Sequence, residues 1–150
     1  MEQFYKYPSD YYDEVLKRDP NHVKTNTALG LQSLKNGDYK TARKQFSKAI
    51  NRLTHDYVRP STGEALYYQG LTLKAMELYN EAIDTLYRAT WDQAYHASAY
   101  FELSQISSMQ GDFDKALHQI NESLSTNMRN HRAVGLKASI QRRLKDFDGA

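Results

Sequence analysis

Histidine is the residue type in this 150-residue chain that would most readily do chemistry, as a metal ligand or an acid–base group. The five histidines are His22, His55, His96, His118 and His131. No two of them lie three or four residues apart with a carboxylate beside them, so the spacing of a zinc site is missing. Cysteine is absent, and so are the Gly-x-Ser-x-Gly, P-loop and Gly-x-Gly-x-x-Gly motifs. We therefore expect no enzymatic activity, no metal and no cofactor.

The charge of the chain is nearly balanced, with 20 basic and 18 acidic residues and a net charge of +2. Such a balance produces no overall attraction to nucleic acid or to an anionic membrane. Basic residues between Arg129 and Lys145 fall on several faces of a predicted helix, which is typical of a solvated surface. The chain has no run of 18 apolar residues and no apolar signal-peptide core near its start. We expect neither nucleic acid nor a membrane as partner, and the cytoplasm is the default compartment.

Aromatic residues recur with alanines in one register along the chain. The pairs are Tyr39/Ala42, Tyr79/Ala82, Phe113/Ala116 and Phe147/Ala150, at steps of 40, 34 and 34 residues. Small residues advance by the same steps, at Gly30, Gly70, Ser104 and Ala138. A period of 34 residues is typical of a two-helix repeat that stacks into a solenoid. Small side chains at these positions would let helix axes approach to about 8–10 Å.

Helix-start and helix-stop signals mark the predicted helices. Residues 36–38 and 110–112 each combine a helix-ending glycine with an N-cap aspartate. The expected helices span residues 9–19, 22–36, 39–54, 62–77, 80–92, 95–110, 113–126 and 129–145. Strand-type alternation is almost absent, so the predicted class is all-α.

Three further caps and one loop are expected from the same signals. Lys145-Asp146 should end one helix and cap the next, and Asn80 or its neighbourhood should cap the helix that follows it. Ser61 and Glu64 fit a capping box. The six additional residues between the first two units fall around 56–62, where Pro60 favours a loop.

The units resemble tetratricopeptide repeats, on the strength of their small and aromatic positions. The first unit carries Leu29, Gly30, Tyr39, Ala42, Phe46 and Ala49, and the second carries Leu66, Gly70, Tyr79, Ala82, Leu86 and Ala89. The third carries Tyr100, Leu103, Ser104, Phe113, Ala116 and Ile120, and the fourth carries Ala138, Phe147 and Ala150. The resemblance implies a right-handed solenoid of antiparallel helix pairs. It would form one array over residues 1–150, with a half repeat at 9–20, repeats at 23–56, 63–96 and 97–130, and a partial repeat at 131–150.

In this repeat family the concave face is built by the first helix of each unit, and proteins or peptides bind there. The residues that the resemblance places on this face are Lys24, Thr27, Glu64, Tyr67, Tyr68, Leu71, Lys74, Ser98, Phe101, Glu102, Gln105 and Arg132. Leu71 and Phe101 could equally be core residues between repeats. The 12 tyrosines of the chain suit such a surface, since tyrosine makes large contacts at little entropic cost.

Family members that bind the acidic tails of chaperones use a clamp of lysine, asparagine and arginine side chains. The corresponding positions here hold Thr27, Leu31, Tyr68, Ser98 and Glu102, or Tyr67, Leu71, Glu102, Arg132 and Leu136 when counted from the second unit. Only Arg132 fits the clamp. The sequence therefore argues against an acidic tail as ligand and favours an apolar or aromatic segment.

We predict a non-catalytic protein-interaction scaffold, with two alternatives. Residues 66–92 are similar to repeat regions of long bacterial proteins that also carry a carbohydrate-handling-like domain, which would make the chain a spacer or assembly module of a larger protein. The second alternative is an RNA-binding helical repeat. Because the array begins and ends in mid-repeat, we also expect a fragment of a longer protein and self-association through the unpaired terminal half-repeats.

Overall fold

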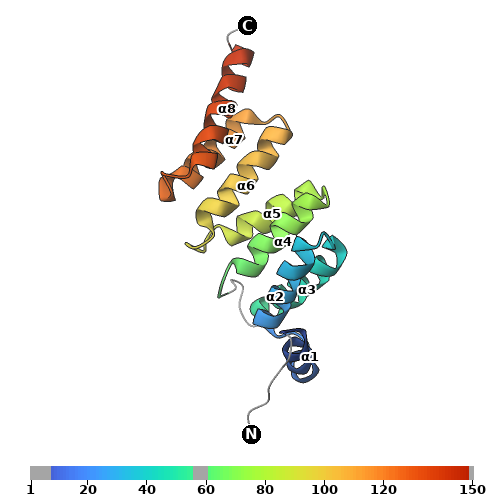
Figure 1. Cartoon of the computed structure of the whole chain (residues 1–150). Helices are drawn as coiled ribbons and strands as arrows, with labels where there is room; N and C mark the ends of the chain where they lie inside the picture. Colours follow the sequence, from blue (N-terminus) through green and yellow to red (C-terminus); the bar gives the residue numbers. More distant parts are fainter. Residues whose placement is uncertain (1–7, 56–60, 149–150) are drawn as a thin grey trace. The chain divides into compact units, whose positions relative to one another are not determined.

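A computed structural model describes residues 8–55 and 61–148 (Figure 1). These residues form eight α-helices and no strand, which confirms the all-α helical repeat class. The helices are α1 (Pro8–Arg18), α2 (Val23–Lys35), α3 (Tyr39–Thr54), α4 (Glu64–Ala75), α5 (Tyr79–Ala89), α6 (His96–Met109), α7 (Phe113–Thr126) and α8 (His131–Asp148). Most of the expected loop around 56–62 lies outside the described residues.

Two compact units make up the chain, Met1–Ser61 and Thr62–Ala150, and each is described by itself. In the first unit, α1 packs on α2 and α2 pairs with α3. In the second unit, α4 pairs with α5 and α6 pairs with α7, while α8 packs on α7 (Figure 1). A single array over the whole chain stays a prediction.

Small residues allow the helices of each pair to approach closely. A Cβ atom built on Gly30 would lie 2.6 Å from the ring of Phe46, and one on Gly70 would lie 2.5 Å from Leu86. Ser104 is fully buried, and its hydroxyl donates to the Ala116 carbonyl at 2.7 Å. The expected close approach is thus confirmed at these three positions.

The second unit buries two apolar clusters. The first contains Leu73, Ala82, Leu86, Leu103 and Ile106, with Tyr79 packed against it. The second contains Phe101, Ala116, Ile120, Ala133 and Ile140, with Phe113 packed against it. The aromatic residues 79 and 113 therefore fill the space beside the cores, as the repeat register predicts.

The glycine–aspartate junctions form as expected. Gly37 and Gly111 have φ of 78° and 81°, a left-handed conformation that a residue without Cβ adopts easily. Asp38 accepts from the Thr41 amide at 3.3 Å, and Asp112 accepts from the Lys115 amide at 3.2 Å.

Two predicted caps in the second unit are wrong. Helix α5 begins at Tyr79, and its N-cap residue is Leu78 with no side-chain hydrogen bond, so Asn80 caps nothing. Helix α4 has Gly63 at its N-cap instead of Ser61. The Asp92 carboxylate accepts from the Gly63 amide at 2.7 Å, so a residue far along the chain supplies the missing acceptor.

The predicted break at Lys145-Asp146 is also wrong, because α8 continues to Asp148. Ending the helix there would force Lys145 into the left-handed region, which is unfavourable for a residue with Cβ. At the corresponding junction after α4, Glu77 adopts a φ of 61°, and the packing of α5 on α4 offsets that strain. No described helix folds back on α8 in this way. Ala150 lies outside the described residues.

Ala138 does not occupy a close helix contact, contrary to the expectation from its register. Its side chain is exposed on α8, because no described helix covers that side. Among the described residues, no helix is long and apolar enough to cross a membrane.

Candidate functional site

The candidate site lies on α4, α6 and α8, the first helices of successive pairs in the second unit. Helix α6 contacts both α4 and α8. Tyr67 and Lys74 lie seven residues apart on α4, as do Ser98 and Gln105 on α6, so each pair shares one helix face. Contacts across these helices bring several predicted residues to one surface, which we call the inner face; they are Tyr67, Tyr68, Lys74, Ser98, Glu102, Gln105 and Arg132.

Three tyrosine rings form a contiguous cluster at one end of the inner face. The centroid of Tyr67 lies 5.1 Å from that of Tyr68 and 5.3 Å from that of Tyr95. The rings of Tyr68 and Tyr95 are 6.2 Å apart and meet edge to face. These separations are typical of favourable aromatic pairs. We call Tyr67, Tyr68 and Tyr95 the tyrosine cluster.

The electrostatics of the inner face keep the Tyr67 hydroxyl neutral. Burial, with a smaller contribution from the negative charge of Glu102, raises the pKa of Tyr67 to about 12. A hydrogen bond with Ser98 and the positive charge of Arg132 act in the opposite direction. Burial likewise raises the pKa of Tyr95, with a smaller contribution from Glu64. Both hydroxyls can therefore donate and accept hydrogen bonds near neutral pH.

A compact polar group lies beside the tyrosine cluster. The Lys74 Nζ donates to Glu102 Oε2 and to Gln105 Oε1, each at 2.6 Å. The side chains of Lys74 and Glu102 are only 24% and 11% exposed. Since two internal acceptors already satisfy the Lys74 ammonium, this lysine offers little to the carboxylate of a ligand. We call these three residues the lysine network.

Phe101 belongs to the core, which decides between the two interpretations left open by the sequence. It is 6% exposed and packs in the second apolar cluster. The guanidinium carbon of Arg132 lies 4.8 Å from the centre of its ring, a cation–π geometry that holds this exposed arginine on the inner face. Leu71 is half-buried, so part of it remains accessible.

Two predicted residues belong to α2 in the other unit. Lys24 is exposed, whereas Thr27 is only 6% exposed and has little surface left for contact. That Lys24 and Thr27 contribute to the same binding surface as the inner face stays a prediction.

Tyr95 is the member of the site that the sequence analysis missed. It directly precedes α6 and lies three residues before Ser98. Extending the predicted face by one helical turn toward the start of α6 would have found it. Within the part of the chain that the structure describes, no three His, Asp or Glu side chains are grouped to hold a metal ion.

The fold defines a class of helical-repeat proteins, and comparisons with known proteins support one family within it. The model of the tetratricopeptide repeat family matches residues 11–44. This segment therefore belongs to the tetratricopeptide repeat family, and the described helices of the whole chain share its fold. The match starts inside α1, which makes α1 part of the repeat pattern.

Solved structures of tetratricopeptide repeat proteins superpose on most of the chain. A MamA crystal structure has a TM-score of 0.71 at 27% identity, over 89% of this chain and 75% of that chain. The second repeat domain of human RPAP3, solved with an HSP70 peptide, has a TM-score of 0.68 at 15% identity, over 79% of this chain and 94% of that one. Yeast Tom70 has a TM-score of 0.78 at 19% identity, over 93% of this chain but 31% of Tom70.

Proposed function

We propose that the chain is a non-catalytic protein-interaction module that binds a peptide or protein segment on the inner face. The observation that carries this proposal is the tyrosine cluster beside the lysine network. Three adjoining tyrosine rings with their hydroxyls provide large contact area and hydrogen-bonding groups at little cost in side-chain entropy. Helical repeats commonly use such a surface for binding.

The chemistry of the inner face favours a segment with apolar or aromatic side chains over an acidic tail. Lys74 is neutralised by Glu102, and Glu102 itself would repel a ligand carboxylate. Among the described residues of the second unit, the predicted site has two basic side chains, Lys74 and Arg132. Lys74 pairs with Glu102, whereas Arg132 is exposed and lies over the Phe101 ring. One carboxylate or backbone carbonyl near Arg132 could orient the segment, while the tyrosines supply the main contact area. The RPAP3 domain was solved with an HSP70 peptide ending in Glu-Glu-Val-Asp, and we expect such a peptide to bind this chain weakly.

For the test, peptides that bind the full chain are first selected from a displayed random library. Affinities are then measured by isothermal titration calorimetry for the wild type and for Tyr68→Ala/Tyr95→Ala. We expect a loss of at least about tenfold, equivalent to about 1.4 kcal/mol, because interface aromatics contribute energies of this order. Tyr67 stays unchanged in this variant, since it also packs against the core.

The matched control is Asp84→Ala/Arg88→Ala, which removes two exposed side chains of α5. This control should bind the selected peptides as the wild type does. Equal affinity of the tyrosine variant and the wild type would refute the inner face as the binding surface. Tight binding of the acidic HSP70-type peptide, lost on Arg132→Ala, would contradict the proposed ligand chemistry.

A further inference from the structure

Two carboxylates lie beside the tyrosine cluster. Glu64 is the first residue of α4 and lies four residues before Tyr68, so the two side chains share one face of that helix. Asp92 lies three residues before Tyr95. Burial raises the pKa of Tyr95, and the negative charges of Glu64 and Asp92 add to this effect. Both carboxylates are therefore close enough to act on the Tyr95 hydroxyl.

The two carboxylates differ in the partners that they already have. Asp92 accepts from the amides of Gly63 and Ala94 at 2.7 and 3.0 Å, which holds its charge in place beside the cluster. The half-buried Glu64 has no such bond to its carboxylate, and no basic side chain pairs with it in the part of the chain that the structure describes. Its carboxylate therefore remains available to a cation on a ligand.

The rings of the tyrosine cluster leave room for a cation only on their outer surface. Their centroids are 5.1 to 6.2 Å apart, so the rings contact one another and a charged group cannot enter between them. All three tyrosines are half-buried, so part of each residue remains accessible. The face of an aromatic ring attracts a cation. Arg132 already adopts this geometry within the inner face, 4.8 Å from the ring centre of Phe101.

The inner face is electrically asymmetric. Lys74 offsets the charge of Glu102, and the positive charge of Arg132 acts on Tyr67. The charges that act on Tyr95, in contrast, are the negative ones of Glu64 and Asp92. A ligand cation is therefore favoured at the Tyr95 side of the cluster.

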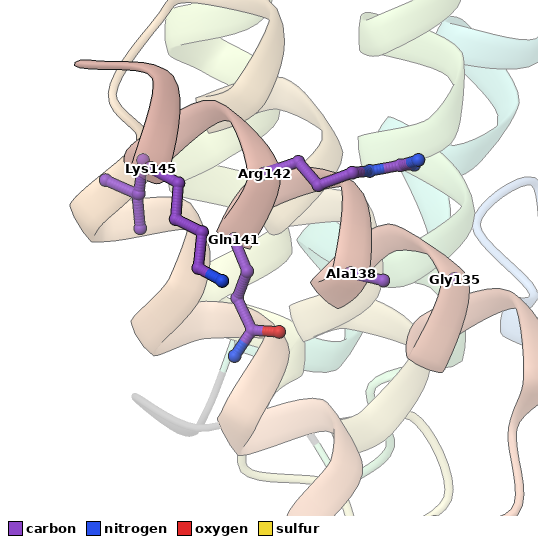
Figure 2. Close-up of a pocket in the computed structure, with 6 residues that line it drawn as sticks. Gly135, Ala138, Gln141, Arg142 and Lys145 are labelled. Atoms are coloured by element: carbon purple, nitrogen blue, oxygen red, sulfur yellow. The ribbon is translucent and has the colours of Figure 1, made fainter. Parts of the chain in front are cut away.

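The hollow along α8 has the opposite charge. It is lined by Gly135, Ala138, Gln141, Arg142, Leu144 and Lys145. Figure 2 shows the Arg142 and Lys145 side chains extending from the helix. None of these described lining residues is aromatic or acidic. This hollow would repel the cation that the tyrosine cluster attracts.

We propose that the segment bound on the inner face carries an arginine side chain that stacks on the tyrosine cluster and pairs with Glu64. This contact rests on the function proposed above and names the ligand group that the cluster accepts. Arginine fits better than lysine because its planar guanidinium stacks on aromatic faces and binds both oxygens of a carboxylate. An acidic group of the same segment would lie toward Arg132, which sets the direction of binding.

The probes for the test are peptides selected on the full chain from a displayed random library. Arginine should be enriched at one position relative to the unselected library. Replacing this arginine by citrulline keeps the planar group and removes the charge, and calorimetry should then show affinity about fivefold lower. Glu64→Gln should weaken the arginine peptide by a similar factor and leave the citrulline peptide unchanged, because the lost interaction is the same one.

The matched control is Glu77→Gln, which makes the same change at an exposed residue beyond the other end of α4. This variant should bind both peptides as the wild type does, and circular dichroism should show native helix content for both variants. The citrulline comparison changes the peptide alone, so it does not depend on how a variant folds.

The results separate this contact from the proposed function. If Tyr68→Ala/Tyr95→Ala weakens binding but the arginine and citrulline peptides bind equally well, the arginine contact is wrong and the inner face remains the binding surface. The same conclusion follows if Glu64→Gln weakens both peptides alike or if arginine is not enriched. If the tyrosine variant binds as the wild type does, the inner face itself is refuted.

Discussion

Gly70→Ala should destabilise the chain, although this change usually stabilises a helix. Alanine in a helix interior is favoured over glycine by about 0.5–1 kcal/mol. The new methyl group, however, would lie 2.5 Å from both Cγ and Cδ2 of Leu86, which is fully buried. Relieving such an overlap in a packed core costs about 1–3 kcal/mol. We expect a net loss of about 1 kcal/mol, since the strain exceeds the gain in propensity.

Gly135→Ala is the matched control within the same chain. Gly135 also lies in a helix, but no atom would contact its new Cβ within 4 Å. This variant should gain up to about 1 kcal/mol, so the two substitutions should shift stability in opposite directions. Urea titration followed by far-ultraviolet circular dichroism measures both midpoints. Dilute protein is used so that association does not contribute.

A double-mutant cycle with Leu86 isolates the proposed overlap. Leu86→Ala alone should cost about 2–5 kcal/mol, since Leu86 is fully buried. In the Gly70→Ala background its cost should fall by about 1 kcal/mol, because the atoms that overlap are the ones removed. If Gly70→Ala stabilises the chain as much as Gly135→Ala does, or if the cycle shows no coupling, the close approach of α4 and α5 is not what requires glycine.

Three further substitutions test the site and its support. Tyr67→Phe should remove a phenol that titrates near pH 12 in ultraviolet absorbance. Because Tyr67 ionises at a lower pH in the unfolded chain than in the folded one, the free energy of unfolding of the wild type should fall between pH 10 and 12 more than that of the variant. If the absorbance change that disappears in Tyr67→Phe has its midpoint at pH 10, the buried environment of Tyr67 is contradicted. Lys74→Met should destabilise the chain by about 1–3 kcal/mol by leaving Glu102 without its cation, and Glu102→Gln in the same chain should restore part of the loss; a double variant no better than Lys74→Met would count against the pair. Asp92→Ala should cost about 1 kcal/mol and accelerate hydrogen exchange at the Gly63 amide, and an unchanged exchange rate would show that the amide does not depend on this carboxylate.

Much of the candidate site followed from the resemblance to tetratricopeptide repeats together with helical spacing. The resemblance puts the first helix of each unit on the binding face, and an interval of seven residues puts Tyr67 with Lys74 on one side of α4 and Ser98 with Gln105 on one side of α6. Spacing does not state how far a side chain is buried or which neighbour it meets. For this reason Phe101 was left between two interpretations, and its place in the core emerged only with the packing of α6 on α7 and α8.

Short-range signals determined the helix junctions where glycine was present. Gly37 and Gly111 end their helices because only a residue without Cβ enters the left-handed region at little cost. Lys145 follows the same register without that freedom, and α8 continues through it. Glu77 shows that packing can impose the same conformation on another residue. The outcome at such a junction therefore depends on whether a following helix is there to pack.

The sequence by itself determined the hairpin register of this protein, since small residues must lie where helix axes meet and large apolar residues must fill the space between them. That register is local in origin, because it repeats along the chain and needs no knowledge of distant contacts. The tertiary structure alone decided that Asp92 caps α4, that Tyr95 completes the tyrosine cluster and that Glu102 neutralises Lys74. Each of these contacts joins residues from different helices or loops. Their geometry depends on how the helices stack, which no spacing within one helix specifies.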